Sequence, residues 1–430
     1  MTPQAQSTSA TSEPTREERR VLQELARRKR EIGLLPVQQE RQRAWTDLNG
    51  LRPVRPMVWI NEIPWPELEA ADPAALQARC RNPVLRAAET ELRRELYQWD
   101  HFQADMIVDP FLVYRLVGGP DGSYADYGLK PKEIRKKGAH DVLFQPRIES
   151  LDDVQRIHQP RVWVDHEKTE RRRKRLEEAL EGAIPVVVRG LTTQWHTPWD
   201  YAVRWYGVER LMYDLIDRPE LVAATCERVC QHTLAVLDEQ ERLGMLAVGN
   251  GNWRVGSGGL GCTDELPSGP LDRPATARDQ WGCGNAQIFS EVSASMHEEF
   301  SLRFERPVIE RFGLSYYGCC EPLHRKIPML RSLKNLRKIS MSPKANLRQA
   351  ADTVGRDYVL SFKPNPAHVA GDAFDAPLVR AYLRQALKDL RGSPIEIIFK
   401  DITTIRSDPQ RLHAWERIAM EVAMEVEAEG

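Results

Sequence analysis

The stretch IPVVVRGL, at residues 184–191, decides the fold. Its continuous β-branched run is typical of a parallel strand that is covered on both faces. Similar apolar runs alternate with helical sequence along the chain: MVWI (57–60), DMIVDPFLV (105–113), MLAVG (245–249), LSYYGCC (314–320), LRKISM (336–341), YVLSF (358–362) and IEIIF (395–399). About eight strands that alternate with helices predict the α/β class, as a closed (β/α)8 TIM barrel rather than an open sheet.

The segments around this core divide the chain into three parts. Residues 1–15 are small and polar, which predicts a disordered N-terminus. Residues 16–50 are rich in Arg and Glu and predict a helical extension, a hairpin broken around Gly33 and Pro36. We interpret its basic character as a solvated amphipathic surface rather than a nucleic-acid site. Residues 51–430 are then assigned to the barrel.

Composition excludes several classes of protein. The 430 residues carry a net charge of −1, so no global field favours nucleic acid or a membrane surface. No apolar run reaches the roughly 18 residues of a membrane span, and the N-terminus has no secretory signal. The seven cysteines include no CxxC pair, which argues against a disulfide framework. The sequence therefore predicts a cytoplasmic protein. No GxGxxG follows the first strand, so a dinucleotide-binding domain is not indicated either.

Residues 249–284 form a long segment rich in Gly and Pro. Loops of this length are usually functional or disordered, and Trp253 and Trp281 argue against disorder. In a barrel this segment would follow a strand and lie over the mouth formed by the carboxyl ends of the strands. A substrate lid is the prediction, and a purely structural excursion is the alternative.

Several stretches resemble the uroporphyrinogen decarboxylase superfamily, over roughly Trp45 to the end of the chain. They are RGLTTQW (189–195), YAVRWYGVERLMYDLIDRPE (201–220), FSLRFERPVIERFG (300–313) and KDITT (400–404) with the following Asp408-Pro409. The superfamily includes uroporphyrinogen decarboxylases and zinc enzymes that move methyl groups to or from a corrinoid. The resemblance implies a (β/α)8 barrel with N-terminal helices and, in many relatives, a homodimer.

The chain departs from the decarboxylase branch of this family. That branch carries an Arg-rich loop after the first strand, where this chain reads WINEIPW (59–65), and a His near the last strand, where it reads IEIIFKDITTIRSDP (395–409). Asp109 matches the aspartate of the second strand, and Tyr201 loosely matches a family tyrosine; the resemblance makes both candidate catalytic residues. A polyanionic tetrapyrrole needs cationic clamps. True uroporphyrinogen decarboxylation is therefore not the prediction.

The chain also departs from the methyltransferase branch. The family's His-x-Cys becomes Tyr317-Gly-Cys319, and its late Cys becomes Thr403 or Thr404. A rebuilt zinc site is one hypothesis, with ligands from Cys319 or Cys320, Glu321 or Glu291, and His324 or His297. If the strand continues, Cys319 and Glu321 share a face. The alternatives are a metal-free Cys319 nucleophile or acid beside Glu321, with Tyr317 nearby, or a pair of small core residues.

The remaining candidates bind substrate. Lys363, Asn365, Lys400 and Asp401 follow the last two strands, where barrels often bind anions; a Lys400 ion pair with Asp401 or Asp109 is the alternative. Trp59, Arg189, Trp195 and Trp253 are expected to line an aromatic-walled pocket, although some of these tryptophans will belong to the core.

Three functions remain open. The first is transfer of a methyl group from a small methylated substrate to a corrinoid held by a separate partner protein, since the chain has no corrinoid-binding motif of its own. The second is decarboxylation of a porphyrinogen or a smaller acid, with Asp109 or Glu321 as proton donor. The third is non-catalytic binding of a tetrapyrrole or a partner protein.

Overall fold

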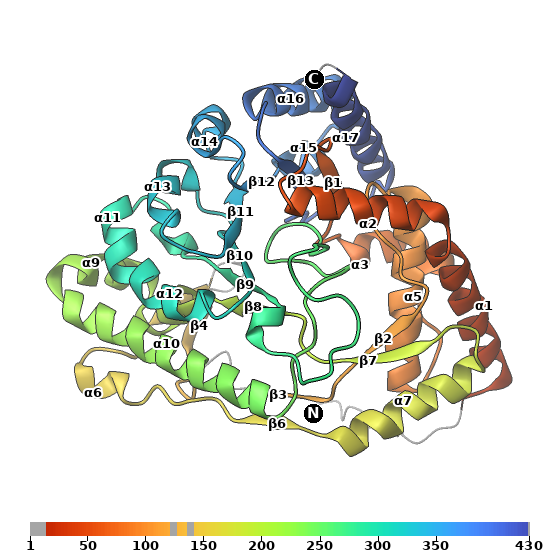
Figure 1. Cartoon of the computed structure of the whole chain (residues 1–430), viewed down its shortest axis with the longest axis horizontal. Coiled ribbons are helices and arrows are strands. Elements are labelled where there is room, and N and C mark those ends of the chain that lie inside the picture. Colours follow the sequence, from red (N-terminus) through yellow and green to blue (C-terminus); the bar gives the residue numbers. More distant parts are fainter. Residues whose placement is uncertain (1–13, 121–126, 136–141, 429–430) are drawn as a thin grey trace.

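The computed structural model describes residues 14–120, 127–135 and 142–428. Its centre is a seven-stranded sheet with the order β1-β13-β12-β11-β10-β9-β8, in which every neighbouring pair is parallel (Figure 1). The strands are β1 (Met57–Ile60), β8 (Thr193–His196), β9 (Trp281–Gly284), β10 (Leu314–Tyr317), β11 (Leu336–Met341), β12 (Val359–Phe362) and β13 (Ile395–Phe399). The α/β class predicted from the sequence is thus confirmed.

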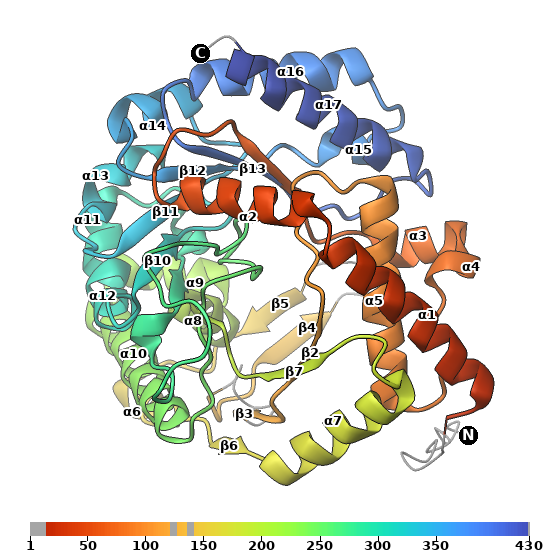
Figure 2. The same cartoon turned by 45° about the vertical axis from the view of Figure 1, so that its right-hand side comes forward.

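Three two-stranded sheets complete the β structure. β2 (Leu112–Arg115) pairs in parallel with β7 (Val186–Arg189). The antiparallel pairs are β3 (Gly118–Pro120) with β6 (Val162–Val164), and β4 (Lys132–Arg135) with β5 (Val142–Gln145). β8 begins soon after β7 in the chain, so β7 and β2 extend the arc of the large sheet (Figure 2).

Helices cover the outside of this arc. They are α1 (Arg16–Gly33), α2 (Pro36–Asn49), α3 (Trp65–Ala71), α4 (Pro73–Leu76), α5 (Pro83–His101), α6 (Leu151–Val154), α7 (His166–Leu180), α8 (Pro198–Tyr206), α9 (Val208–Asp217), α10 (Pro219–Arg242), α11 (Ala294–His297), α12 (Arg303–Ile309), α13 (Ile327–Leu330), α14 (Leu347–Val354), α15 (Ala367–Ala370), α16 (Ala376–Asp389) and α17 (Gln410–Ala428). Short 3-10 turns occupy Ala277–Asp279, Gln287–Phe289 and Leu323–Arg325, and a π turn occupies Glu298–Leu302. Among the described residues, no helix combines the length and apolar character needed to cross a bilayer.

The ring is not closed by strand pairing within the described residues. β1 is the last strand on one side of the sheet, and it does not pair with β2. Instead, the backbone N–H of Asp105, which precedes β2 in the chain, donates to Val58 O of β1 at 2.9 Å, and Val58 N donates to the Asp105 carboxylate. The structure therefore shows a parallel half-barrel sheet, and the closed eight-stranded barrel stays a prediction.

Three strand predictions need correction. Residues 184–191 do form a strand, at Val186–Arg189, and this strand pairs with β2. It is half-exposed rather than buried on both faces, because one of its faces borders a cavity instead of a second layer. In residues 105–113, pairing begins only at Leu112. Residues 245–249 contribute a single bridge, Leu191 to Leu246, and no strand.

The helical extension is confirmed. α1 starts at a capping box: the Thr15 hydroxyl accepts from Glu18 N, and the Glu18 carboxylate accepts from Thr15 N at 2.7 Å. Pro36 lies in the first turn of α2, where its fixed φ and missing N–H are tolerated. Residues 1–13, to which most of the predicted disorder belongs, lie outside the described residues.

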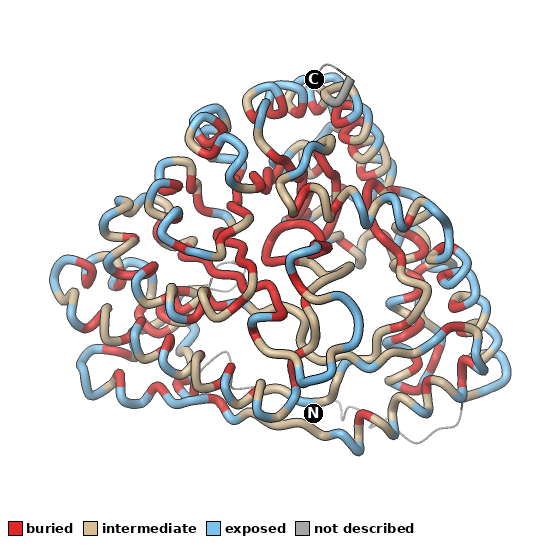
Figure 3. Tube along the Cα trace, in the orientation of Figure 1, coloured by how far each residue is buried: buried red, intermediate tan, exposed pale blue. Residues whose placement is uncertain are grey.

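Part of the long glycine-rich segment is buried on the inner side of the half-barrel sheet. Residues 255–262, here called the inner loop, are all buried (Figure 3). A Cβ on Gly258 would lie 2.5 Å from Glu396 Oε1, and one on Gly259 would lie 2.5 Å from the Trp45 ring, so only glycine admits this approach. The inner loop is thus part of the core, while lid behaviour of the wider segment stays a prediction.

A fully buried ion pair holds the inner loop. Lys338 Nζ lies 2.8 Å from Glu396 Oε2, and neither side chain has any exposed area. Gly259 N donates to Glu396 Oε1 at 3.0 Å, and Lys338 Nζ donates to Leu260 O at 3.3 Å. Lys338 also lies over the rings of Trp45 and Trp281, at 5.7 and 5.5 Å. Both charges are thereby paired and hydrogen-bonded, as burial requires.

We predict that Glu396→Ala lowers the free energy of unfolding by roughly 3–5 kcal/mol, because it leaves the Lys338 ammonium buried and unpaired. Chemical denaturation followed by circular dichroism measures this. The control is Asp357→Ala, which removes the exposed Arg331–Asp357 pair and should cost less than about 1 kcal/mol. Equal losses in the two variants would contradict the central role of the buried pair.

Candidate functional site

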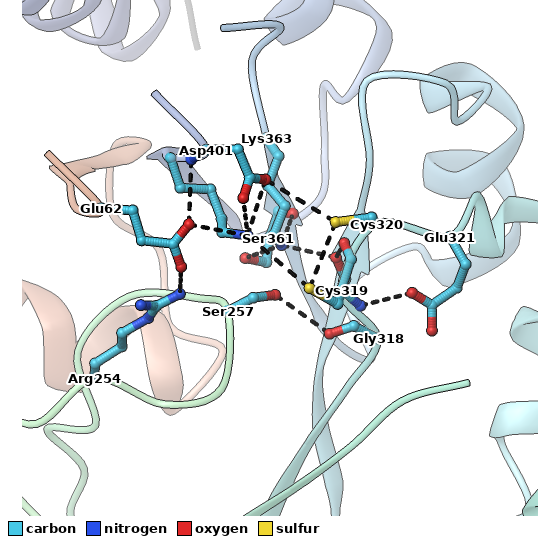
Figure 4. A network of polar contacts seen from close by, with 12 residues as sticks. Glu62, Arg254, Ser257, Gly318, Cys319, Cys320, Glu321, Ser361, Lys363 and Asp401 are labelled. Atoms are coloured by element: carbon cyan, nitrogen blue, oxygen red, sulfur yellow. Dashed lines mark hydrogen bonds and ion pairs between the residues drawn. The ribbon is translucent and has the colours of Figure 1, made fainter. Parts of the chain in front are cut away.

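Polar side chains that follow four strands meet at the carboxyl edge of the sheet. Cys319 comes after β10, Lys363 after β12, Lys400 after β13, and Glu62 after β1. Parallel strands place their carboxyl ends at one rim, which is where barrel enzymes carry their chemistry. Polar contacts join these residues into one connected network (Figure 4).

Two adjacent thiols lie at the centre of this network. Cys319 Sγ and Cys320 Sγ are 3.6 Å apart; Cys319 is half-buried and Cys320 is exposed. The Ser340 hydroxyl donates to Cys319 O at 2.7 Å and fixes the turn that carries both thiols. The predicted alternation of side chains does not apply here, because β10 ends at Tyr317 and both thiols reach the same rim.

Lys400 connects the thiols to two carboxylates. Its Nζ lies 3.9 Å from Cys319 Sγ, 2.9 Å from Asp401 Oδ2 and 3.5 Å from Glu62 Oε2. Arg254, from the segment just before the inner loop, donates to Glu62 Oε1 at 2.6 Å. Although burial opposes it, the Arg254 hydrogen bond lowers the pKa of Glu62 to about 2. The Lys400–Asp401 ion pair considered from the sequence is therefore present, and it lies beside the thiols.

Lys363 is a buried cation held by neutral oxygens. Its Nζ donates to Tyr316 Oη at 2.6 Å and to Ser340 Oγ at 2.7 Å, and it contacts Ser361 O and Oγ at 3.3 Å. Burial lowers the pKa of Lys363 to about 8, and among its charged neighbours Cys319 does most to hold the ammonium form. An anionic Cys319 is thus the natural counter-charge of Lys363.

These neighbours favour the thiolate of Cys319. The hydrogen bond from Cys320, together with the Lys400 and Lys363 charges, lowers the pKa of Cys319 to about 7 against the opposing effect of burial. The same contact raises the pKa of Cys320, which stays a thiol within reach of both the Cys319 sulfur, at 3.6 Å, and Asp401 Oδ2, at 4.0 Å. A thiolate beside cations is the reactive form of cysteine.

Glu321 and Tyr317, two predicted catalytic residues, point away from the thiols. Glu321 is fully buried and accepts from Cys319 N at 2.8 Å and Ala286 N at 3.3 Å, so it positions the turn; burial raises its pKa. Tyr317 Oη donates to Glu305 at 2.6 Å and contacts His297 Nε2 at 2.8 Å, in a buried network on the outer side of β10. Burial raises the pKa of Glu305 to about 8.

The predicted zinc ligands do not assemble. Over the described parts of the chain, no three His, Cys, Asp or Glu side chains come together in a way that could hold a metal ion. His297 is engaged with Tyr317 and Lys326, and Glu291 is exposed. His324 Nδ1 is buried without a partner, but His324 belongs to no such group of three among the described residues. The arrangement of these residues therefore does not fit zinc.

A second group of predicted residues lines a separate cavity. Asp109, Arg189 and Trp253 face a cavity of about 770 Å³, and Asp109 and Trp253 also face a neighbouring one of about 460 Å³. Burial raises the pKa of Asp109, whose Oδ2 accepts from Asn252 at 3.2 Å. The sequence placed these three residues in one pocket with the cysteines, whereas here they line a cavity apart from the thiols, and their roles stay predictions.

Four other candidates have different surroundings from those expected. Tyr201 stacks on Trp205 in an aromatic cluster of α8, and Asn365 caps its own turn by accepting from Ala367 N. Trp59 is a half-buried neighbour of two core clusters, and Trp195 is 38% exposed on β8. None of the four takes part in the contacts of the thiol network.

Sequence reasoning missed Glu62, Arg254, Ser340 and Ser361. Glu62 follows β1 just as Lys400 follows β13, so its position could have indicated a role. Ser340 lies two residues after Lys338, and Ser361 lies two residues before Lys363. Polar residues two apart in an otherwise apolar strand point to the same face, so this spacing could have indicated a polar site. Arg254 gave no signal beyond its place in the long segment.

Comparisons with known proteins give little guidance. No protein-family model matches the chain. A search of curated proteins finds no similar sequence. Among solved structures, a methyltransferase from Methanosarcina mazei is similar with a TM-score of 0.49 at 11% identity, over 89% of this chain and 98% of that one. No conclusion about activity follows from a similarity of this size, and the family resemblance stays a prediction.

We predict that alkylation of Cys319 by iodoacetamide is half-maximal near pH 7, below the roughly 8.5 of an unperturbed cysteine. The rate rises with pH because the thiolate reacts and the thiol does not. Lys400→Met should move the midpoint up by about one unit, because it removes the nearest cation. Rates come from mass spectrometry, with fragmentation to separate Cys319 from Cys320.

The control for this titration is Lys334→Met, an exposed lysine that precedes β11 at the opposite edge of the sheet. It should leave the midpoint unchanged. A midpoint near 8.5 for the wild-type protein would show that Cys319 is not activated.

Proposed function

We propose that the chain is a methyltransferase in which the Cys319 thiolate takes a methyl group from a small methylated substrate. The observation that supports this is the sulfur of Cys319 at the strand rim, with Lys400 Nζ at 3.9 Å and the Cys320 thiol at 3.6 Å. A thiolate is a strong nucleophile towards an electrophilic carbon, and its neighbours here hold it in that form. We further propose that the half-barrel sheet closes as the (β/α)8 barrel of the uroporphyrinogen decarboxylase superfamily.

The proposed reaction has two displacements. In the first, an electron pair on Cys319 Sγ forms the S–CH3 bond while the bond from the methyl carbon to the donor atom breaks, and the donor leaves with the electron pair of the broken bond. In the second, an acceptor attacks the methyl carbon and Cys319 leaves again as thiolate. The Lys400 and Lys363 charges that lower the pKa of Cys319 also make it a better leaving group.

The acceptor suggested by the family resemblance is a corrinoid carried by a separate protein. Cys320 is exposed and Cys319 half-buried, so the thiol rim is open to a second molecule. A partner that docks at this edge of the sheet could therefore present its acceptor to Cys319. Neither this partner nor a homodimer is needed for the first displacement.

A carboxy-lyase is the second candidate function. The observation that favours it is Asp109, whose raised pKa suits a proton donor, in a cavity shared with Arg189. A substrate whose carboxylate binds Arg189 would lie next to Asp109, the proposed proton donor. In this case the thiols would take no part in the chemistry.

Cys319→Ser is predicted to abolish methyl transfer, with a loss of roughly 1,000-fold or more, since serine is a far weaker nucleophile. The assay incubates purified protein with isotopically labelled O-, N- and S-methyl compounds and searches by mass spectrometry for a labelled thioether on Cys319. Cys320→Ser is the matched control, because its hydroxyl can still donate to the Cys319 sulfur and should retain most of the transfer.

Three outcomes separate the candidates. A methyl adduct on Cys319 supports the proposal. Carbon dioxide release from small acids that survives in Cys319→Ser and is lost in Asp109→Asn supports the lyase. Unimpaired function in vivo of a strain carrying Cys319→Ser and Asp109→Asn together would contradict both and favour a non-catalytic binding protein.

A further inference from the structure

The Arg189 side chain is held between two aromatic rings at the wall of a cavity. Its Cζ lies 5.5 Å from the centroid of Phe111 and 5.1 Å from that of Trp253. The cavity has a volume of about 770 Å³, within the range of small-molecule sites. Cation–π contacts of this kind hold a guanidinium without using its N–H donors.

Those donors are free among the described residues. The Arg189 side chain makes no hydrogen bond or ion pair within the described parts of the chain, and its Nε is buried without a partner. The Trp253 Nε1, in the same wall, is also buried and unpartnered. A buried donor without an acceptor costs about 1–3 kcal/mol, so this wall is suited to receive acceptors from a ligand.

The other arginine of the cavity is already satisfied. Arg273 donates through both terminal nitrogens to the two oxygens of Asp279, at 2.7 and 2.8 Å. This pair shows the bidentate geometry that Arg189 could offer to a ligand carboxylate. Arg189, in contrast, makes no ion pair among the described residues, and Asp109 is the carboxyl group of the same wall that acts on it from a longer distance.

The remaining wall favours a singly charged ligand. Asp109 faces the same cavity and burial raises its pKa, so one arginine, Arg189, is the charge available to balance a ligand anion there. The wall further offers the amides of Asn250 and Asn252 and the apolar side chains of Val187, Val248 and Leu271. A planar monoanion with a short apolar body matches this arrangement.

We propose that the cavity beside Arg189 binds a small monocarboxylate, whose two oxygens accept from the Arg189 guanidinium while its apolar part lies against Val187, Val248 and Leu271. This site goes beyond the methyl transfer proposed above, since none of its lining residues belongs to the thiol network. The loop that carries Trp253 continues into Arg254, which bonds Glu62, so the two sites share one segment of chain.

Isothermal titration calorimetry on the full chain tests this proposal. The probes are acetate, propionate and benzoate, with propionamide and benzamide as neutral analogues and inorganic phosphate as the dianionic one. At least one carboxylate should bind while its amide and phosphate do not. Arg189→Met should weaken that binding by about 10- to 100-fold, the effect of one hydrogen-bonded charge pair.

Two further variants keep the test decisive. Arg189→Lys retains the charge but loses the two parallel N–H donors of the guanidinium. It should therefore bind the carboxylate more weakly than wild type and more tightly than Arg189→Met. This variant also shows whether a loss of binding in Arg189→Met comes from a folding defect. Arg242→Met, which removes an exposed arginine of α10 that pairs with Glu239 and does not line the cavity, should retain the wild-type affinity.

The outcomes for this site are independent of the thiols. Cys319→Ser should bind the carboxylate as tightly as wild type, so failure of methyl transfer would leave this proposal standing. No carboxylate binding to the wild-type protein, equal binding of phosphate, or unchanged affinity in Arg189→Met would each overturn it.

Discussion

The buried pair of Lys338 and Glu396 is the constraint on which the rest of the structure depends. The pair joins β11 to β13. Glu396 Oε1 also accepts from Gly259 N, and Lys338 Nζ donates to Leu260 O, so the same two side chains hold the backbone of the inner loop. Because two charges cannot remain buried without these bonds, the loop must stay inside the sheet. Trp45 of the N-terminal extension covers the same lysine, so helix, loop and sheet share one electrostatic centre.

This centre also places the two candidate sites. The inner loop is buried against the sheet, whereas Trp253 and Arg254, the residues just before it, are partly exposed. Trp253 stacks on Arg189 in the cavity wall, and Arg254 bonds the carboxylate that contacts Lys400. The thiol rim and the cavity are thus positioned by neighbouring residues of one segment, although they share no lining side chain.

Sequence reasoning recovered what depends on local pattern. The helical hairpin, β1, β11 and β13 have the predicted bounds to within about a residue, because caps, prolines and apolar runs act locally. The half-exposure of β7 could not be read from its valines, since it depends on a cavity formed by distant segments. The same limit applied to the site: Cys319, Lys363 and Lys400 were identified from strand ends, whereas the orientation of Glu321 and Tyr317 was set by buried networks that no spacing reveals.

The pairing of β1 with β13 has a consequence for how the chain is made. Met57–Ile60 pairs with the strand at Ile395–Phe399, so β1 lacks this partner until the ribosome has synthesised those residues. Long-range parallel pairing of this kind also slows folding, because a large loop must close before the contacts form. The nascent N-terminal helices and β1 will spend the time of synthesis with an uncovered apolar edge, and are the region where chaperones would bind first.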